Sequence, residues 1–246
     1  MPKIISPNII DKTVAISKID VEKKPVIFWD TCSLLDIVRL PLPNRKQSVS
    51  TLQNLLEIKD KIVSDDIISL SSKLCVDEFN NHIEHYVKEV KTASTKLSQT
   101  FNDFVGFINK VNATGTLIPT TNLSVYKIED LLCQIAHVII DKTFFINEDA
   151  TFALFAHTRT TLKIPPAKKK GEYKDCYIWG TCLELRNTSA DKTYSYNFMS
   201  SNTTDFADTN KRDFVTEIKN EADLNSIEYF SNFNVAYGKL KTIGII

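Results

Sequence analysis

The sequence lacks an excess of charge of either sign, because 30 Lys and Arg residues are balanced by 30 Asp and Glu residues. A nucleic-acid partner would therefore have to meet a local basic surface, since the field of the whole protein does not attract a polyanion. Long apolar runs are missing as well: none approaches the roughly 18 residues that a membrane-spanning helix needs. We therefore expect no membrane-spanning segment.

The sequence also lacks paired cysteines. Its five cysteines form no C-x-x-C motif, and their odd number fits reduced thiols in a cytosolic protein better than a disulfide or zinc framework. Asp11 and Lys12 interrupt the apolar stretch near the N-terminus, so we expect no signal peptide and a cytoplasmic location. The absence of G-x-S-x-G, P-loop and G-x-G-x-x-G motifs leaves serine hydrolases, NTPases and dinucleotide-binding proteins without support.

Apolar periodicity predicts strands that alternate with helices. Strands are predicted at 26–29, 67–70 and 235–237, and in the stretch YNFMSSN that begins at Tyr196. Helices are predicted at 33–40, 48–63, 75–90, 97–111, 124–140, 149–162, 175–187 and 211–219, with a loop over 163–174. This pattern favours an N-terminal arm over 1–23 and one α/β domain over 24–246, with a helical insertion over about 90–150.

Several acids fall where a parallel sheet would gather them. Asp30 ends the first predicted strand, Glu78 lies near the start of one helix, and Asp175 opens another. Asn202 and Asp205 follow a later strand. Sites in open parallel sheets form outside the carboxyl ends of the strands, so these side chains can converge. Clustered carboxylates repel one another, and Mg²⁺ or Mn²⁺, which takes oxygen ligands, would relieve that repulsion.

These residues and their surroundings resemble the PIN domain, a family of metal-dependent nucleases. The resemblance covers roughly residues 25–206 and rests on VIFWDTCSLLD with Asp30, LCVDEFNNHI with Glu78, GEYKDCYIWGTCLEL with Asp175, and FMSSNTTDF. In the last segment Ser200 stands where the family usually has Thr. The stretch RTTLKIPPAKKKGEYKDCYIW is further similar to the larger bacterial members.

The resemblance implies a three-layer α/β/α sandwich around a central parallel sheet. It implies that Asp30, Glu78, Asp175 and Asp205 hold Mg²⁺ or Mn²⁺, with Asn202 as a possible further ligand, and it leaves open which of Asn202 and Asp205 faces the metal. The 97 residues between Glu78 and Asp175 exceed the spacing of the compact toxin-type members, which argues against a simple toxin–antitoxin role.

Further residues are candidates for substrate binding. Thr31 is placed to orient a metal-bound water or a phosphate, and phosphate contacts are expected from Arg159, Lys168, Lys169, Lys170 and Lys174. In the simpler alternative, the lysines belong to a solvent-exposed loop without a partner, and the Arg159 side chain only packs over its own helix. Glu78, His82 and His85 share one helical face, so a zinc site is a second alternative, although H-E-x-x-H is absent.

Two functions remain open at this point. The first is a Mg²⁺- or Mn²⁺-dependent endonuclease that acts on RNA, because most of the resembled family acts on RNA. The second is a catalytically weak PIN-like module that binds nucleic acid or a regulatory protein partner. The complete set of acids favours the first.

Overall fold

The computed structural model describes residues 7–43, 48–111, 115, 117–168 and 172–246. Its strands are β1 (Asn8–Ile10), β2 (Val26–Trp29), β3 (Ile68–Ser72), β4 (Phe144–Ile146), β5 (Tyr196–Met199) and β6 (Ile227–Phe230). Its helices are α1 (Lys12–Glu22), α2 (Thr31–Arg39), α3 (Val49–Val63), α4 (Lys73–Val111), η2 (Leu123–Tyr126), α5 (Ile128–Lys142), α6 (Ala150–Leu162), α7 (Tyr173–Thr188), α8 (Thr216–Leu224) and α9 (Phe233–Thr242).

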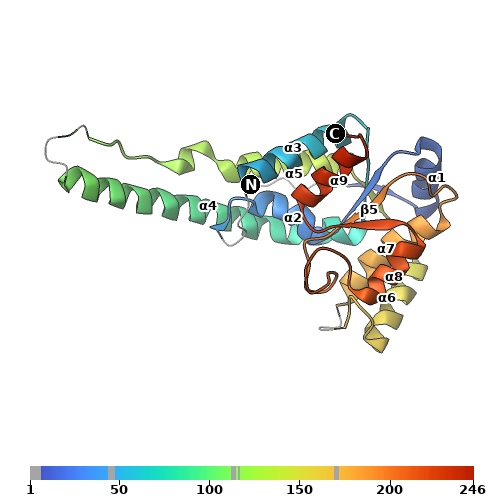
Figure 1. Ribbon diagram of the computed structural model, residues 1–246. Coiled ribbons are helices and arrows are strands. Elements are labelled where there is room, and N and C mark those ends of the chain that lie inside the picture. The colour runs from blue at the N-terminus through green and yellow to red at the C-terminus, as the bar shows by residue number, and fades with distance from the viewer. Residues whose placement is uncertain (1–6, 44–47, 112–114, 116, 169–171) are drawn as a thin grey trace.

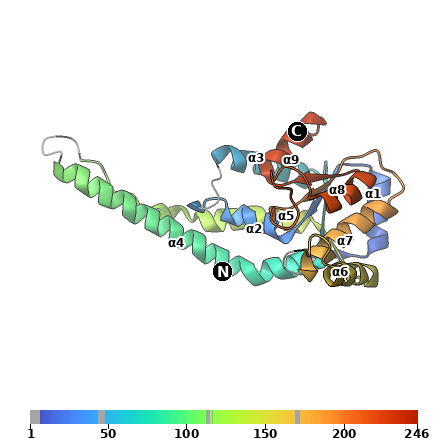
Figure 2. The same cartoon turned by 60° about the horizontal axis from the view of Figure 1, so that its bottom comes forward.

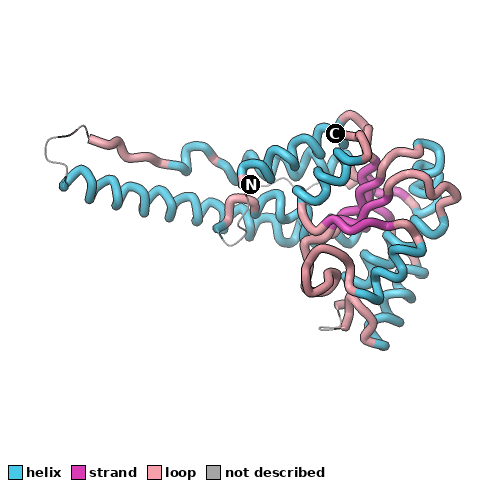
Figure 3. The backbone as a smooth tube through the Cα atoms, viewed as in Figure 1, coloured by secondary structure: helices cyan, strands magenta, loops and turns pink. Residues whose placement is uncertain are grey.

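The strands form one parallel sheet in the order β1-β4-β3-β2-β5-β6. Helices cover both faces of this sheet, as Figures 1 and 3 show. The predicted three-layer α/β/α architecture is therefore confirmed. A parallel sheet buried on both faces requires nearly continuous apolar strands, and the buried run of β2 satisfies this requirement.

The sheet divides the apolar interior into two clusters. Successive side chains of a strand point to opposite faces. Ile27 and Trp29 accordingly pack with α2, α3, α4, α5 and α9, whereas Val26 and Phe28 pack with α1, α6, α7 and α8. Each cluster contains large, fully buried side chains, with Phe79 in the first and Trp179 in the second.

Three predicted segments differ from the structure. Residues 8–22, assigned to an arm, form β1 at the edge of the sheet and α1, which lies against α7. The strand predicted at 235–237 is part of α9, and the last strand is β6. The helix predicted at 211–219 is α8, which begins later, at Thr216. Phe233, Ala236 and Leu240 explain the error at 235–237, because their three- and four-residue steps bury one helical face.

The predicted insertion is narrower than 90–150, because β4 belongs to the sheet and α5 packs on α2 and α3. The part that leaves the body is the distal half of α4, whose chain then returns beside it (Figures 1 and 2). Asn102 and Asn109 hydrogen-bond the returning backbone at Thr121 and Ile118. Among the described residues, no helix combines the length and apolar character needed to cross a membrane.

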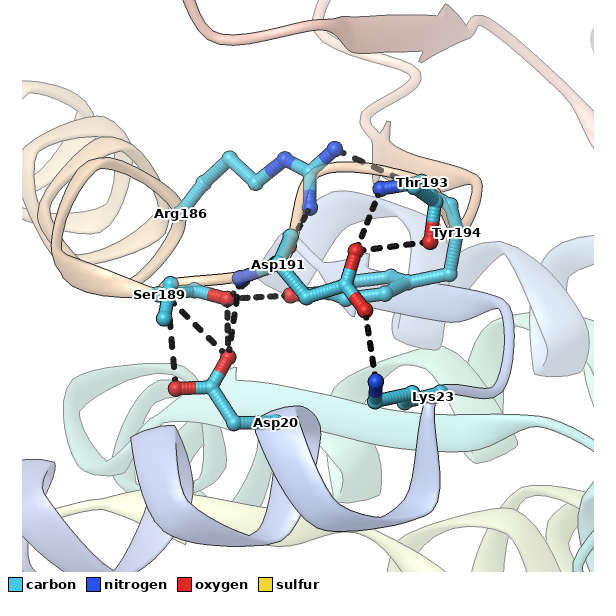
Figure 4. Close-up of polar contacts among 8 residues, drawn as sticks. Asp20, Lys23, Arg186, Ser189, Asp191, Thr193 and Tyr194 are labelled. Atoms are coloured by element: carbon cyan, nitrogen blue, oxygen red, sulfur yellow. Dashed lines mark hydrogen bonds and ion pairs between the residues drawn. The ribbon is translucent and has the colours of Figure 1, made fainter.

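A polar network fixes the loop that leads from α7 into β5 (Figure 4). The buried guanidinium of Arg186 donates to the carbonyl oxygens of Asp191, Lys192, Tyr194 and Asn225. Asp20 of α1 accepts hydrogen bonds from Ser189 and from the Ala190 and Asp191 amides, and Asp191 in turn pairs with Lys23 at 3.1 Å. The network ties the first helix to the entry of a central strand.

Candidate active site at the carboxyl edge of the sheet

The candidate site lies where the chain connections of the sheet diverge. From β2 the chain runs to β3 and β4 on one side, and later to β5 and β6 on the other. Trp29 is in register with both Ser71 and Met199, so the carboxyl ends of β2, β3 and β5 lie level. In open parallel sheets, ligands bind in the crevice that forms at such a point.

Asp30 follows β2 directly and is buried at this edge. Its Oδ2 atom accepts hydrogen bonds from Ser200 Oγ at 2.6 Å and from Cys32 Sγ at 2.8 Å. Its backbone amide donates to Met199 O, which joins the ends of β2 and β5. Burial raises the pKa of Asp30, with a further contribution from the charge of Glu78, although the hydrogen bonds from Cys32 and Ser200 oppose this shift.

A chain of hydrogen bonds connects Asp30 to Asp175. The Ser200 hydroxyl that donates to Asp30 also accepts from the Asn202 amide at 3.1 Å. Asn202 Nδ2 then donates to Asp175 Oδ2, also at 3.1 Å. Burial raises the pKa of Asp175 to about 8, followed in effect by the negative charges of Asp30, Asp205, Glu172 and Glu78. These acids therefore lie close enough to disfavour one another's charge.

Glu78 lies on the second turn of α4, directly after β3, and forms an ion pair with Lys174 at 3.1 Å. Lys174 lies in the first turn of α7, one residue before Asp175. The pair therefore links the helices on either side of Asp30. In this arrangement the ammonium group neutralises one of the converging carboxylates.

Two buried oxygen atoms at this edge have no hydrogen-bond partner among the described residues: Thr31 Oγ1 and Asp205 Oδ1. An unpartnered buried oxygen is costly, so such an atom indicates a missing ligand, water or ion. The oxygen-only set of nearby carboxylates and one amide is the type that Mg²⁺ and Mn²⁺ prefer. The donor chemistry therefore fits a hard divalent cation.

The side chains are nevertheless not arranged in a closed coordination shell. Within the described ranges, no group of three or more His, Cys, Asp or Glu residues is positioned to hold a metal ion. The protein's own donors occupy the acids instead, as the bonds from Ser200 to Asp30 and from Asn202 to Asp175 show. The zinc alternative gains no support either, because Glu78 pairs with Lys174 and the His85 ring packs against Tyr86.

A comparison with known protein families matches most of the chain that forms this fold. A family model described as the PIN domain matches residues 27–206, from β2 to the segment after β5. The chain belongs to the PIN domain family. No match was found among curated proteins or among solved structures. PIN domains are generally nucleases that bind nucleic acid, and the match includes every acid that the sequence analysis selected.

Arg159 takes a structural role in this PIN domain rather than the predicted phosphate contact. Its buried guanidinium donates to Pro165 O through Nε at 2.7 Å and through Nη2, and it pairs with Glu221. These contacts hold the α6–α7 loop against α8, so the side chain has no exposed face to offer a substrate.

The predicted lysines fall into three groups. Lys168 is exposed and pairs with Glu217 at 3.0 Å. Lys174 pairs with Glu78 inside the candidate site, as described above. Lys169 and Lys170 lie outside the described residues.

Three neighbours of the acids were not selected from the sequence as site residues: Cys32, Glu172 and Ser200. Cys32 and Ser200 both donate to Asp30, and Glu172 raises the pKa of Asp175. Glu172 lies at the N-cap of α7, three residues before Asp175, and the sequence shows this closeness only as an acid next to the start of a predicted helix. Ser200 follows Met199, which is paired with Trp29, and this relation appears only once the strand order is known.

Proposed function

We propose that this PIN-domain protein is a Mg²⁺- or Mn²⁺-dependent endoribonuclease that hydrolyses phosphodiester bonds in RNA. The observation that supports the proposal is that Asp30 and Asp175 lie at one sheet edge and are joined by hydrogen bonds through Ser200 and Asn202, where burial raises the pKa of both acids. Perturbed acids in such a place are characteristic of functional sites. RNA is the proposed substrate because most of the family acts on it.

Asp30, Glu78, Asp175 and Asp205 would hold the cation, with Asn202 as a further oxygen ligand. The bound cation supplies an activated water and neutralises charge on the phosphate as it reacts. Ser200 and Cys32 orient Asp30 through their hydrogen bonds, and Asn202 orients Asp175. The buried hydroxyl of Thr31, which lacks a partner in the described part of the chain, is available to a water or a phosphate oxygen.

The substrate backbone would meet lysines, because the chain has no net charge to attract it. We assign this role to Lys168, Lys169, Lys170 and Lys174. Lys174 now forms an ion pair with Glu78. If Glu78 binds the cation, this ion pair would break and the Lys174 ammonium group would contact a phosphate of the substrate instead. We place the activity in the cytoplasm, where the five cysteines would stay reduced.

The decisive experiment is cleavage of single-stranded RNA with Mn²⁺, in the presence and absence of chelator. Glu78→Gln and Asp30→Asn should abolish metal-dependent cleavage while the proteins stay folded. Asp77→Asn is the matched control for Glu78, because Asp77 is the exposed neighbour on the same helix and should leave cleavage unchanged. Equal cleavage by the parent and by Asp30→Asn would refute the assignment.

A catalytically weak module that binds RNA or a regulatory protein is the second candidate. The observation that favours it is the set of protein donors already on the acids, namely Lys174 on Glu78 and Ser200 on Asp30. Under this alternative the parent would bind RNA without cutting it, and Mn²⁺ would not raise its melting temperature.

A further inference from the structure

The half of α4 that leaves the body carries an exposed apolar stripe. Leu97, Phe101, Phe104, Ile108 and Val111 recur at steps of four and three residues, and between 45% and 86% of each residue is exposed. We call these five residues the distal seam. Steps of four and three residues are the heptad spacing by which one helix packs along another. The spacing therefore suits a helical partner.

The chain's own return segment occupies a different face of this helix. The Ser98 hydroxyl accepts a hydrogen bond from the Leu123 amide. Asn102 and Asn109 each donate to the returning backbone through Nδ2 and accept from it through Oδ1. Ser98 and Val105 are buried on that face. The polar face thus holds the hairpin together and leaves the distal seam facing outward.

We propose that the distal seam pairs with the distal seam of a second copy of this chain, antiparallel about a two-fold axis. In this arrangement Phe101 lies against Phe104 of the second copy, and Leu97 lies against Ile108. The seam suits such pairing because it has two phenylalanines at its centre and aliphatic side chains at both ends. A two-fold axis requires a self-complementary surface, which this sequence order provides.

The exposed area is large enough for a dimer. An aromatic side chain carries on the order of 150–250 Å² of surface. With about half to four-fifths of each residue exposed, the distal seam offers roughly 600 Å² per copy, at the upper limit for a monomeric protein. Two seams would bury about 1,200 Å² in total, the lower bound for a specific interface. Phe107, which is 70% exposed beside the seam, adds to this area.

Charge favours a second copy over a nucleic acid or a lipid surface. Residues 97–111 contain one acid, Asp103, and one base, Lys110, and neither belongs to the distal seam. The positions that flank the seam, Thr100 and Phe107, are uncharged, so two copies bring no like charges together. A polyanion would find no basic row along this helix. The distal half of α4, which carries the seam, projects away from the body and leaves room for a second body at the opposite end (Figures 1 and 2).

The test is the mass in solution, measured by light scattering after gel filtration at micromolar concentration. The parent should have the mass of two chains, and Phe101→Asp/Phe104→Asp should have the mass of one. Both side chains are exposed in the single chain, so the variant should keep the helix content and melting behaviour of a folded domain. Thr92→Asp/Gln99→Asp is the matched control: it adds the same charges to exposed positions off the seam and should stay dimeric.

A mixing experiment tests the antiparallel register. Phe101→Lys and Phe104→Asp should each weaken the dimer when alone. Their mixture should restore it, because an antiparallel pair sets the lysine of one chain against the aspartate of the other. A parallel pair would set each charge against phenylalanine and restore nothing.

Three outcomes would overturn the proposal: a monomeric parent, a dimer that survives the double Asp change, or a mixture that stays monomeric. If the parent is monomeric but binds RNA or lipid vesicles through side chains that the double Asp variant lacks, the seam has a different occupant. None of these outcomes depends on the metal site, so RNA cleavage and dimerisation are tested separately.

Discussion

Replacing Asp175 by Asn should stabilise the metal-free protein. The folded structure raises the pKa of Asp175 from its ordinary value of 3.8 to about 8, chiefly through burial and the charge of Asp30. The folded state therefore binds this proton more tightly than the unfolded state does. Its stability must fall as the pH rises from about 4 to about 8, and the loss is complete above pH 8. Asn keeps an oxygen that can accept the Asn202 hydrogen bond but carries no charge.

Because a tenfold change in proton affinity corresponds to about 1.4 kcal/mol, the rise of the Asp175 pKa from 3.8 to about 8 sets an upper limit of about 6 kcal/mol. Asp175 is only half-buried, and water screens its acidic neighbours, so we expect a gain of about 1–3 kcal/mol at pH 8. For a domain of this size, that gain raises the melting temperature by roughly 2–10 °C. Below about pH 4 the parent and the variant should melt together.

The assay is thermal unfolding with chelator across pH 4 to 9. Asp191→Asn is a control of opposite sign. Hydrogen bonds from Thr193, and then the Lys23 ion pair, lower the pKa of Asp191 to about 2. Its charge therefore stabilises the fold above about pH 4, and this contribution is lost as the pH falls toward 2. Asp191→Asn should melt below the parent at pH 7. If Asp175→Asn melts below the parent at pH 8, the acids do not repel one another and the reasoning fails.

Three further outcomes are expected. Mn²⁺ should raise the melting temperature of the parent more than that of Asp30→Asn, because a ligand stabilises only the state that binds it; equal shifts would remove Asp30 from the metal site. Alanine at Lys168, Lys169 and Lys170 together should weaken RNA binding about equally for different sequences and flatten its log–log salt dependence by about 0.7 per lost contact, as measured by titration. Arg186→Lys should lower the free energy of unfolding in urea by about 2–4 kcal/mol, because an ammonium group cannot reach the four carbonyl oxygens that Arg186 binds; an unchanged midpoint would show that this network contributes little.

The sequence predicts the central part of the fold well, because β2 and the start of α2 depend on local signals. Val26 to Trp29 is continuously apolar, and Asp30 follows it directly. The edge strand β1 escapes prediction because it has only three residues and is largely exposed, so burial leaves no pattern in it. β4 escapes for a related reason: it also has only three residues, and it lies in a stretch where the apolar stripes of helices dominate the pattern.

The candidate site is predictable in its acids but not in their partners. Asp30, Glu78 and Asp175 each stand at the end of a strand or the start of a helix, which the sequence reveals. Lys174 meets Glu78 across 96 residues of chain, and Arg159 meets Glu221 across 62. Such pairings arise only from packing, so a sequence cannot distinguish an arginine that binds phosphate from one that supports a loop.

The two apolar clusters lie on opposite faces of the sheet and divide the domain into two halves. A cavity opened at Phe79 lies on one side of the hydrogen-bonded sheet and a cavity at Phe152 on the other, so their costs should add rather than compensate. The candidate site is the exception to this independence. Glu78 comes from a helix of one half, Asp175 comes from a helix of the other half, and Asp30 follows a strand of the sheet between them. Each half can therefore vary in sequence alone, except at the helix positions whose carboxylates act on the pKa values of Asp30 and Asp175.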